Sequence, residues 1–160
     1  MLLYKTLVRT QMEYASAIWS PQAITHIELL EKIQRRFTRF VFRKFHIPYH
    51  NYQSRLKILE LESLHNRRRY TDLLLLYKIV NGIVKTSCIK DITFRLNRRN
   101  LRNSDLLTVP TYTLDAAKSS PLPRIMSAYN NLFKGDNYFC VPLNVYKKIV
   151  KRYLFQDDIY

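Results

Sequence analysis

The residues best suited to chemistry in this sequence are basic residues that recur at helical spacing. They are Lys32, Arg35, Arg36, Arg39 and Arg43. At about 100° of turn per residue, all five fall on one side of a helix, and no acidic residue lies between them. Like charges at this spacing repel each other, whereas the phosphate backbone of a nucleic acid would attract them. The pattern therefore indicates a nucleic-acid interface, and a solvated charged face is the alternative.

A second basic group consists of Arg67, Arg68 and Arg69, shortly after Ser63. We expect a helix to begin at Ser63, so these arginines lie in its first turns. Cations there oppose the helix dipole at a cost of about 0.3–1 kcal/mol each. We predict that the group forms a second patch in contact with a polyanion, and a solvated helix start is the alternative.

Residues that could hold a metal ion or carry catalysis are scarce. His46 and His50 are four residues apart, but Pro48 prevents a regular helix from presenting them together, so we interpret them as polar loop residues. The segment 155–158, Phe-Gln-Asp-Asp, superficially resembles the aromatic-x-Asp-Asp signature of polymerases. That site needs a return strand and a further aspartate, and only two residues follow here, so we interpret the match as coincidence.

Other enzyme classes lack their signatures. The chain has only two glycines, Gly82 and Gly135, so a glycine-rich phosphate loop is excluded. It has no G-x-S-x-G motif, and no serine can be assigned a histidine and an aspartate from the sequence. We therefore predict no catalytic site, no metal and no cofactor.

Composition limits the class of protein. The chain has 160 residues, of which 47% are hydrophobic, which suits one domain or one domain with an appendage. Its net charge of +15 favours nucleic acid or an anionic membrane as a partner. The longest apolar run, 73–77, is far shorter than the ~20 residues that span a bilayer. Since the N-terminus shows no secretory signal, we expect a soluble intracellular protein in the nucleus or the cytoplasm, with no membrane partner.

The basic residues belong to a predicted helix from Thr25 to Lys44. Thr25 and Glu28 match a capping box, in which each side chain bonds a free backbone N–H at the helix start. The expected core face lies roughly 140° from the cations. It consists of Ile27, Leu30, Ile33, Phe37, Phe40 and Val41.

Three further helices are predicted before Gly82. The first runs from Leu2 to Trp19 and ends before Pro21, the third runs from Tyr52 to Leu59 after an Asn51 cap, and the fourth runs from Ser63 to a left-handed Gly82. The first helix is indicated by the apolar spacing of Leu3, Leu7, Tyr14, Ala15 and Ile18. Four helices with short connections predict a compact bundle over residues 1–84.

The second half, 85–160, has a different character. Residues 106–114 read as a short extended segment, which Pro110 restricts to an edge or an irregular strand. Two helices are expected, at about 124–133 and 143–155, and the second should bury Val145, Ile149, Val150 and Tyr153. The predicted fold is mainly α, a helical bundle followed by an irregular segment and two further helices.

Several ordered blocks in this chain also resemble one known family. They are Leu3-Tyr4-Lys5, Leu7-Val8-Arg9, Glu13-Tyr14-Ala15-Ser16, Trp19, Pro21, the segment 29–38, Arg55-Leu56, Leu59, Leu61, Ser63-Leu64, Arg67-Arg68-Arg69, Asp72-Leu73, Tyr77-Lys78-Ile79 and Gly82. Together they resemble the region downstream of the polymerase core in reverse transcriptases of non-LTR retrotransposons. The similarity is dense up to Gly82 and sparse after it, where Tyr129 stands at a position that is often Trp in the family.

The resemblance implies a truncated, thumb-like part of an RNA-directed DNA polymerase. The catalytic aspartates of that family lie upstream, in fingers and palm, so this chain is expected to be no enzyme by itself. A thumb is expected to hold RNA or an RNA–DNA duplex by its backbone, and a polymerase palm in trans would be a second partner. The alternative is a protein-interaction bundle that docks an acidic partner or a palm and binds no nucleic acid.

Overall fold

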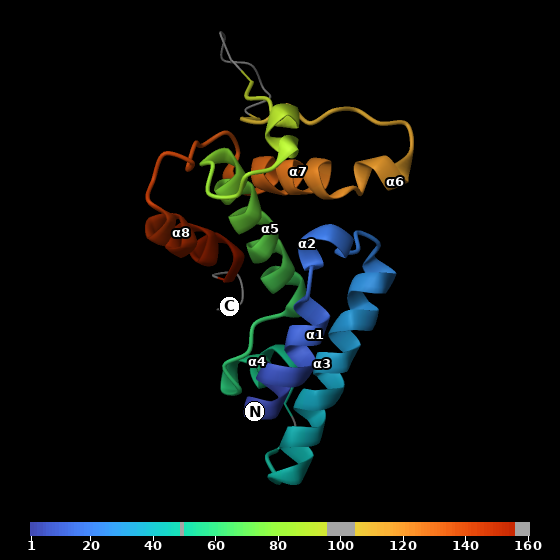
Figure 1. Ribbon diagram of the computed structural model, residues 1–160. Helices are drawn as coiled ribbons and strands as arrows, with labels where there is room; N and C mark the ends of the chain where they lie inside the picture. The colour runs from blue at the N-terminus through green and yellow to red at the C-terminus, as the bar shows by residue number, and fades with distance from the viewer. Residues whose placement is uncertain (49, 96–104, 156–160) are drawn as a thin grey trace.

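The protein has a mainly α fold, as predicted. A computed structural model describes residues 1–48, 50–95 and 105–155 (Figure 1). Within this part of the chain the helical elements are η1 (Tyr4–Val8), α1 (Arg9–Glu13), α2 (Ser16–Trp19), α3 (Ile24–Lys44), α4 (Tyr52–Ile58), α5 (Leu64–Val80), η2 (Ser87–Asp91), α6 (Asp115–Lys118), α7 (Pro121–Phe133) and α8 (Leu143–Phe155). None of these helices is both long enough and apolar enough to cross a bilayer.

Helix α5 lies in the middle of the molecule and contributes to most of the packing. Figure 1 shows it running from a lower group, formed by η1, α1, α3 and α4, to an upper group formed by α7 and α8. The larger hydrophobic core joins Leu73 and Leu76 of α5 to Tyr129 of α7 and Tyr146 of α8. This core joins residues from both sides of position 84. The division into two domains, 1–84 and 85–160, stays a prediction.

The predicted first helix is broken into three short pieces. A π-helical turn, η1, leads into α1, and the chain then bends at Tyr14 and Ala15 before α2. Ala15 adopts a left-handed conformation with φ of 50°, which no helix interior permits. The indole N–H of Trp19 donates to the carbonyl of Tyr14 across the bend, at 2.6 Å. The expected end before Pro21 is confirmed, since Ser20 is extended.

The apolar residues that indicated this first helix do not form its buried side. Leu3 and Leu7 are 73% and 61% exposed, and Tyr14 and Ile18 also face solvent. Tyr4 is buried in their place, because its hydroxyl donates to Gln34 at 2.7 Å and its ring stacks on Phe37 at 4.0 Å. A smaller core therefore forms around Tyr4, Leu56 and Leu61.

The predicted starts of α4 and α5 and the predicted end of α5 are confirmed. The side chain of Asn51 accepts from the N–H of Ser54 at 2.8 Å, and Ser63 accepts from the N–H of Asn66 at 3.2 Å. Gly82 follows α5 with φ of 67°, the left-handed conformation that ends helices. Each of these signals is local, which explains why the sequence was sufficient to find them.

The second half contains the two predicted helices. α8 has the predicted bounds, and α7 begins three residues early because Pro121 suits a first helical turn. The predicted inward side of α8 is only partly right, since Val145 and Tyr153 are exposed while Tyr146 is buried. The extended segment forms no strand among the described residues, only an isolated antiparallel bridge between Phe94 and Leu107.

Candidate nucleic-acid interface

Helix α3 carries the five predicted contact residues, but it starts differently from the prediction. It begins at Ile24 after an extended Ala23, and no side chain caps it. Thr25 and Glu28 both lie inside the helix and are exposed, so the predicted capping box is wrong. The reason is that an N-cap residue must be non-helical, and Thr25 already has a helical neighbour before it.

The buried face of α3 is polar and is rotated from the predicted one. Glu31, Gln34 and Thr38 are buried, whereas Ile33 and Phe40 are 42% and 60% exposed. The expected apolar face was therefore only partly right. Hydrophobic periodicity did not identify this face, since it holds polar side chains whose partners come from distant parts of the chain.

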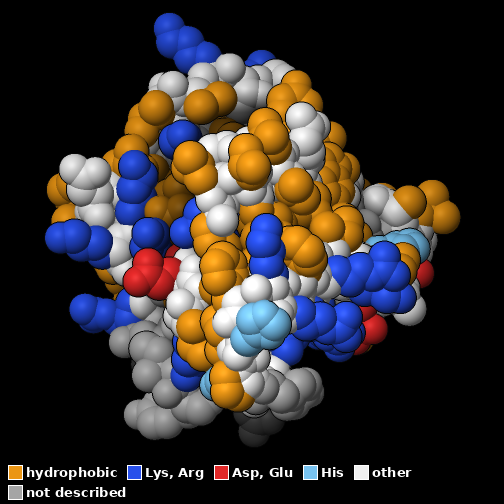
Figure 2. Space-filling model, turned by 90° about the horizontal axis from the view of Figure 1, so that it is seen from below, with side chains coloured by type: hydrophobic (Ala, Val, Ile, Leu, Met, Phe, Trp, Pro, Cys, Tyr) orange, Lys and Arg blue, Asp and Glu red, His pale blue; other side chains and the backbone are white. Residues whose placement is uncertain are grey.

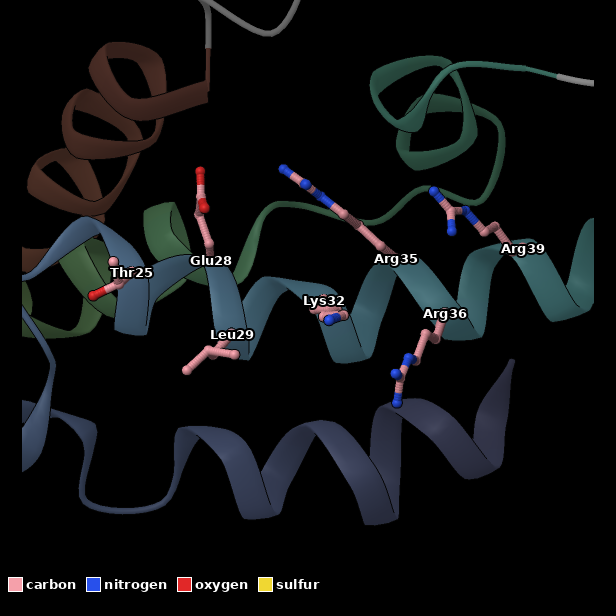
Figure 3. Close-up of a pocket in the computed structure, with 7 residues that line it drawn as sticks. All are labelled: Thr25, Glu28, Leu29, Lys32, Arg35, Arg36 and Arg39. Carbon is pink, nitrogen blue, oxygen red and sulfur yellow. The ribbon is translucent and has the colours of Figure 1, made fainter.

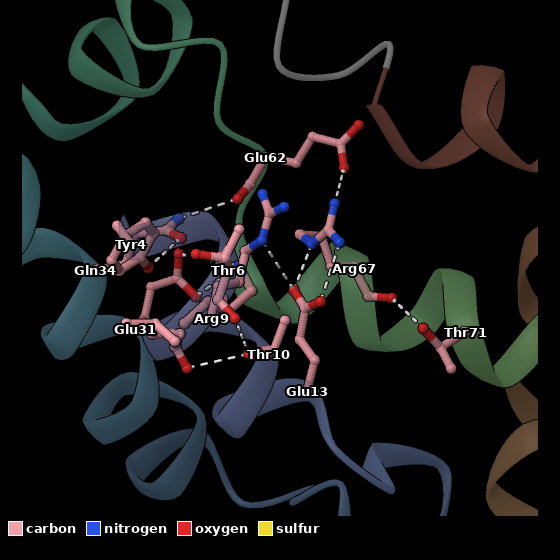
Figure 4. Close-up of polar contacts among 12 residues, drawn as sticks. Tyr4, Thr6, Arg9, Thr10, Glu13, Glu31, Gln34, Glu62, Arg67 and Thr71 are labelled. Atoms are coloured by element: carbon pink, nitrogen blue, oxygen red, sulfur yellow. Dashed lines mark hydrogen bonds and ion pairs between the residues drawn. The ribbon is translucent and has the colours of Figure 1, made fainter. Parts of the chain in front are cut away.

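Hydrogen bonds from three segments explain why polar side chains are buried there. Glu31 accepts from the N–H of Leu64 at 3.1 Å and from the hydroxyl of Tyr52. Gln34 accepts from Tyr4 and donates to the carbonyl of Glu62 at 3.0 Å (Figure 4). Burial, together with the negative charge of Glu31, raises the pKa of both tyrosines. The glutamate thus faces inward and bonds the start of α5, away from the cations.

The five cations all lie on the solvent side of α3. Lys32, Arg35, Arg36 and Arg39 line a hollow of about 470 Å³, together with Thr25, Glu28 and Leu29. In Figure 3, Arg35 and Arg39 point toward one edge of this exposed surface, and Arg36 points toward its opposite edge. Arg39 also lines a second hollow of about 360 Å³, which includes Arg43. The predicted residues are therefore brought together along one exposed surface, which we call the basic face of α3.

The cations of the basic face are not paired with acidic side chains in the part of the chain that the structure describes. Within the described ranges, none of its five cations forms an ion pair or a hydrogen bond with another side chain. The guanidinium of Arg35 lies over the ring of Tyr52 at 5.0 Å, a cation–π contact that leaves its N–H groups available. A surface of this kind can donate many charge-assisted hydrogen bonds to phosphate oxygens.

The second predicted patch is not a continuous surface, because the three arginines have different surroundings. Arg67 bonds the carboxylates of Glu13 and Glu62, the latter at 3.0 Å (Figure 4). Arg68 is 1% exposed and cannot contact a phosphate in this conformation. Arg69 is partly buried and lines a hollow between α5, α6 and α7. Consecutive residues of a helix are about 100° apart, so three neighbours cannot share one face.

No group of His, Cys, Asp or Glu side chains that could hold a metal ion occurs in the part of the chain that the structure describes. His50 packs edge-on against Phe42, and its Nδ1 lies 2.7 Å from the carbonyl of Pro48. Both contacts agree with the interpretation of a polar loop histidine. Asp157 and Asp158 lie outside the described residues.

Buried ionic residues in the middle of the molecule were missed by the sequence analysis. Arg124 of α7 donates to Asp72 of α5 at 3.3 Å and to the carbonyl of Ala17 at 2.6 Å. Burial raises the pKa of Asp72 to about 6, against the opposing effect of Arg124. The partners are 52 and 107 residues apart, so no local pattern signals them.

Comparison with known proteins adds no relative. No protein-family model, no curated protein and no solved structure matches this chain.

Proposed function

We propose that this chain is a non-catalytic part of a retrotransposon RNA-directed DNA polymerase and binds the backbone of RNA or an RNA–DNA duplex through the basic face of α3. The observation that carries the proposal is the exposure of five cations on one helix face, none of which forms an ion pair with another described residue. The blocks that resemble the thumb-like region of non-LTR reverse transcriptases support the same function.

The arrangement suits binding without sequence specificity. Contacts to phosphate position a protein on a duplex, whereas sequence is read by groups that reach base edges. The basic face offers guanidinium and ammonium groups on one continuous helix. Of the two nearby glutamates on α3, Glu31 is buried and Glu28 is exposed in the lining of the hollow. We therefore expect an affinity that depends on charge and salt and little on sequence.

The test is binding of a labelled RNA–DNA hybrid, measured by fluorescence anisotropy at low salt. The variant Arg35→Glu/Arg36→Glu/Arg39→Glu should bind at least roughly a hundredfold more weakly, since three phosphate contacts become repulsions. A matched control, Lys85→Glu/Lys148→Glu/Arg152→Glu, changes three exposed cations elsewhere and alters the net charge equally. Equal loss in both variants would show that net charge alone drives binding and would overturn the proposed interface.

A second candidate function, docking of an acidic partner or of a polymerase palm, is favoured by a different observation. Large apolar side chains stay exposed on this protein. They are Leu29, which lines the hollow of the basic face, Phe40 of the same helix, and Leu3 and Leu7 of the N-terminal segment. Figure 2 shows hydrophobic side chains gathered on one face of the molecule next to Lys and Arg. Exposed apolar areas of this kind mark interaction surfaces in soluble proteins.

The two functions respond to salt in opposite directions. Association through apolar side chains should persist or strengthen when salt rises from roughly 50 to 500 mM, whereas phosphate contacts weaken steeply. Sedimentation velocity of the chain across this range, compared with Leu7→Ser/Phe40→Ser, measures the apolar association. If the chain stays monomeric throughout and the variant behaves identically, these side chains do not promote self-association.

A further inference from the structure

A further basic hollow, separate from the two hollows along the basic face of α3, lies where α5, α6 and α7 meet. It has a volume of about 300 Å³, at the lower end of the roughly 300–1,000 Å³ typical of small-molecule sites. Its cationic walls are Arg69 of α5, Lys118 of α6 and Arg124 of α7. Helix α5 and the consecutive helices α6 and α7 thus bring three cations to one place.

The hydrogen-bonding groups of this hollow are mostly donors. Arg124 is held in a fixed orientation by Asp72 and by the carbonyls of Ala17 and Ser20, and its buried Nε has no hydrogen-bond partner among the residues that the structure describes. Arg69 forms no hydrogen bond or ion pair with any residue that the structure describes. Ser127 and Asn131 add neutral polar groups to the lining.

The charges around the hollow favour an anion over a metal ion. Asp72 is the one carboxylate in its lining, and Arg124 already bonds it. Asp115, which is not part of the lining, forms an exposed ion pair with Lys118 at 2.8 Å, and a phosphate would compete with it for this ammonium group. Behind Asp72 lies Arg68, a buried guanidinium whose three nitrogens lack hydrogen-bond partners in the described structure. His65 also lines the hollow; burial, reinforced by Arg69 and Arg68, lowers its pKa and keeps it neutral at physiological pH. A ligand rich in acceptor oxygens matches this set, and a cation does not.

We propose that the hollow between Arg69, Lys118 and Arg124 binds a phosphate group, carried either by the end of a nucleic-acid strand or by free inorganic phosphate. Arg69 and Lys118 would donate to the phosphate oxygens, and Arg124 would supply a positioned charge beneath them. This site does not depend on the basic face of α3 and can be tested without it.

The first test is calorimetric titration of the 160-residue chain with inorganic phosphate at constant ionic strength. We expect one saturable site, which Arg69→Gln weakens roughly tenfold through loss of a charge-assisted hydrogen bond. Lys118→Gln, at an exposed position, should weaken it in the same direction, and Arg152→Gln on α8 should leave it unchanged. Circular dichroism confirms that each variant is folded. Absence of saturable binding by the folded wild type would overturn the proposal. So would binding by the Arg69 and Lys118 variants that is as tight as that of the wild type.

The second test identifies the source of the phosphate in the Arg35→Glu/Arg36→Glu/Arg39→Glu variant, in which the basic face no longer attracts nucleic acid. Tighter binding of a 5′-phosphorylated oligonucleotide than of its 5′-hydroxyl counterpart, abolished by Arg69→Gln, assigns the site to a strand end. Binding of inorganic phosphate without that preference assigns it to free phosphate. Loss of both kinds of binding overturns the site but leaves the function of the basic face intact.

Discussion

At the scale of single residues, Glu31 determines how α3 presents its charges. Its carboxylate bonds the first N–H of α5 and the hydroxyl of Tyr52, so it faces the protein interior. If it faced solvent, it would lie among Lys32 and Arg35 and neutralise part of the basic face. One inward glutamate thereby stabilises the junction of two helices and leaves Glu28 as the one acidic side chain that lines the hollow of the basic face.

Replacing Glu31 by Ala should destabilise the fold. The change leaves the N–H of Leu64 and the hydroxyl of Tyr52 without their acceptor, at about 1–3 kcal/mol for each buried donor. We expect the free energy of unfolding in urea to fall by roughly 2–4 kcal/mol. Glu28→Ala, one turn earlier and exposed, is the control and should change it by less than about 0.5 kcal/mol. Similar effects of both changes would contradict the capping role of Glu31.

Asp72 should make stability depend on pH. Its pKa is about 6 in the fold and 3.8 ordinarily, because burial disfavours the carboxylate. The folded chain therefore holds this proton more tightly, so the stabilisation by protonated Asp72 is fully present below about pH 4 and is lost as the pH rises through 6. The unfolding free energy of wild type relative to Asp72→Asn should fall by up to about 3 kcal/mol between these limits. Denaturation curves of both proteins at several pH values measure this difference; a constant difference would show that the pKa of Asp72 is not raised.

At the scale of elements, the sequence was informative wherever a helix boundary depends on a local signal. Asn51, Ser63 and Gly82 identified the bounds of α4 and α5 because capping involves residues within one turn. The break at Ala15 and the polar face of α3 could not be found in this way. Both depend on tertiary partners, such as Tyr4 for Gln34, whose proximity no local pattern encodes.

The same reasoning applies to the candidate site. Helical spacing placed the five cations of α3 on one face correctly, since α3 is a continuous helix of 21 residues. The run of Arg67, Arg68 and Arg69 suggested one patch, but these arginines do not share a surface. The exposure and the partners of each depend on what packs against its side of α5. Glu62, which bonds Arg67, directly precedes the cap of α5, but Glu13, its other partner, is 54 residues away and no local pattern brings it to α5.

Asn130 of α7 connects the extended segment to the helices. Its side chain accepts from the N–H of Leu107 at 3.0 Å and donates to the carbonyl of the same residue at 2.8 Å. Asn130→Ala should lower the unfolding free energy by roughly 2–3 kcal/mol, as two buried backbone groups lose their partner. Asn131→Ala, the exposed neighbour, is the matched control and should have little effect on the urea midpoint. Equal midpoints for both variants would mean that the segment is held in another way.

At the scale of the whole molecule, charge and packing divide between two regions. The larger core of α5, α7 and α8 holds most of the buried aromatic side chains. The lower part, around α1 and α3, has the small core, the basic face and the exposed Leu3, Leu7, Leu29 and Phe40. The upper part around α7 and α8 (Figure 1) therefore holds the larger core, while the basic face of α3 lies on the lower part and the hollow of Arg69, Lys118 and Arg124 lies where α5 meets α6 and α7.

The most direct measurement of nucleic-acid binding by the basic face is the salt dependence of affinity for an RNA–DNA hybrid. Five phosphate contacts should give a slope of log K against log salt of about −4, at roughly −0.7 to −0.9 for each contact. In Arg35→Glu/Arg36→Glu/Arg39→Glu, two of the five cations remain, and the slope should fall to between about −1 and −2. A slope near zero for the wild type, or the same slope for both proteins, would contradict binding through α3.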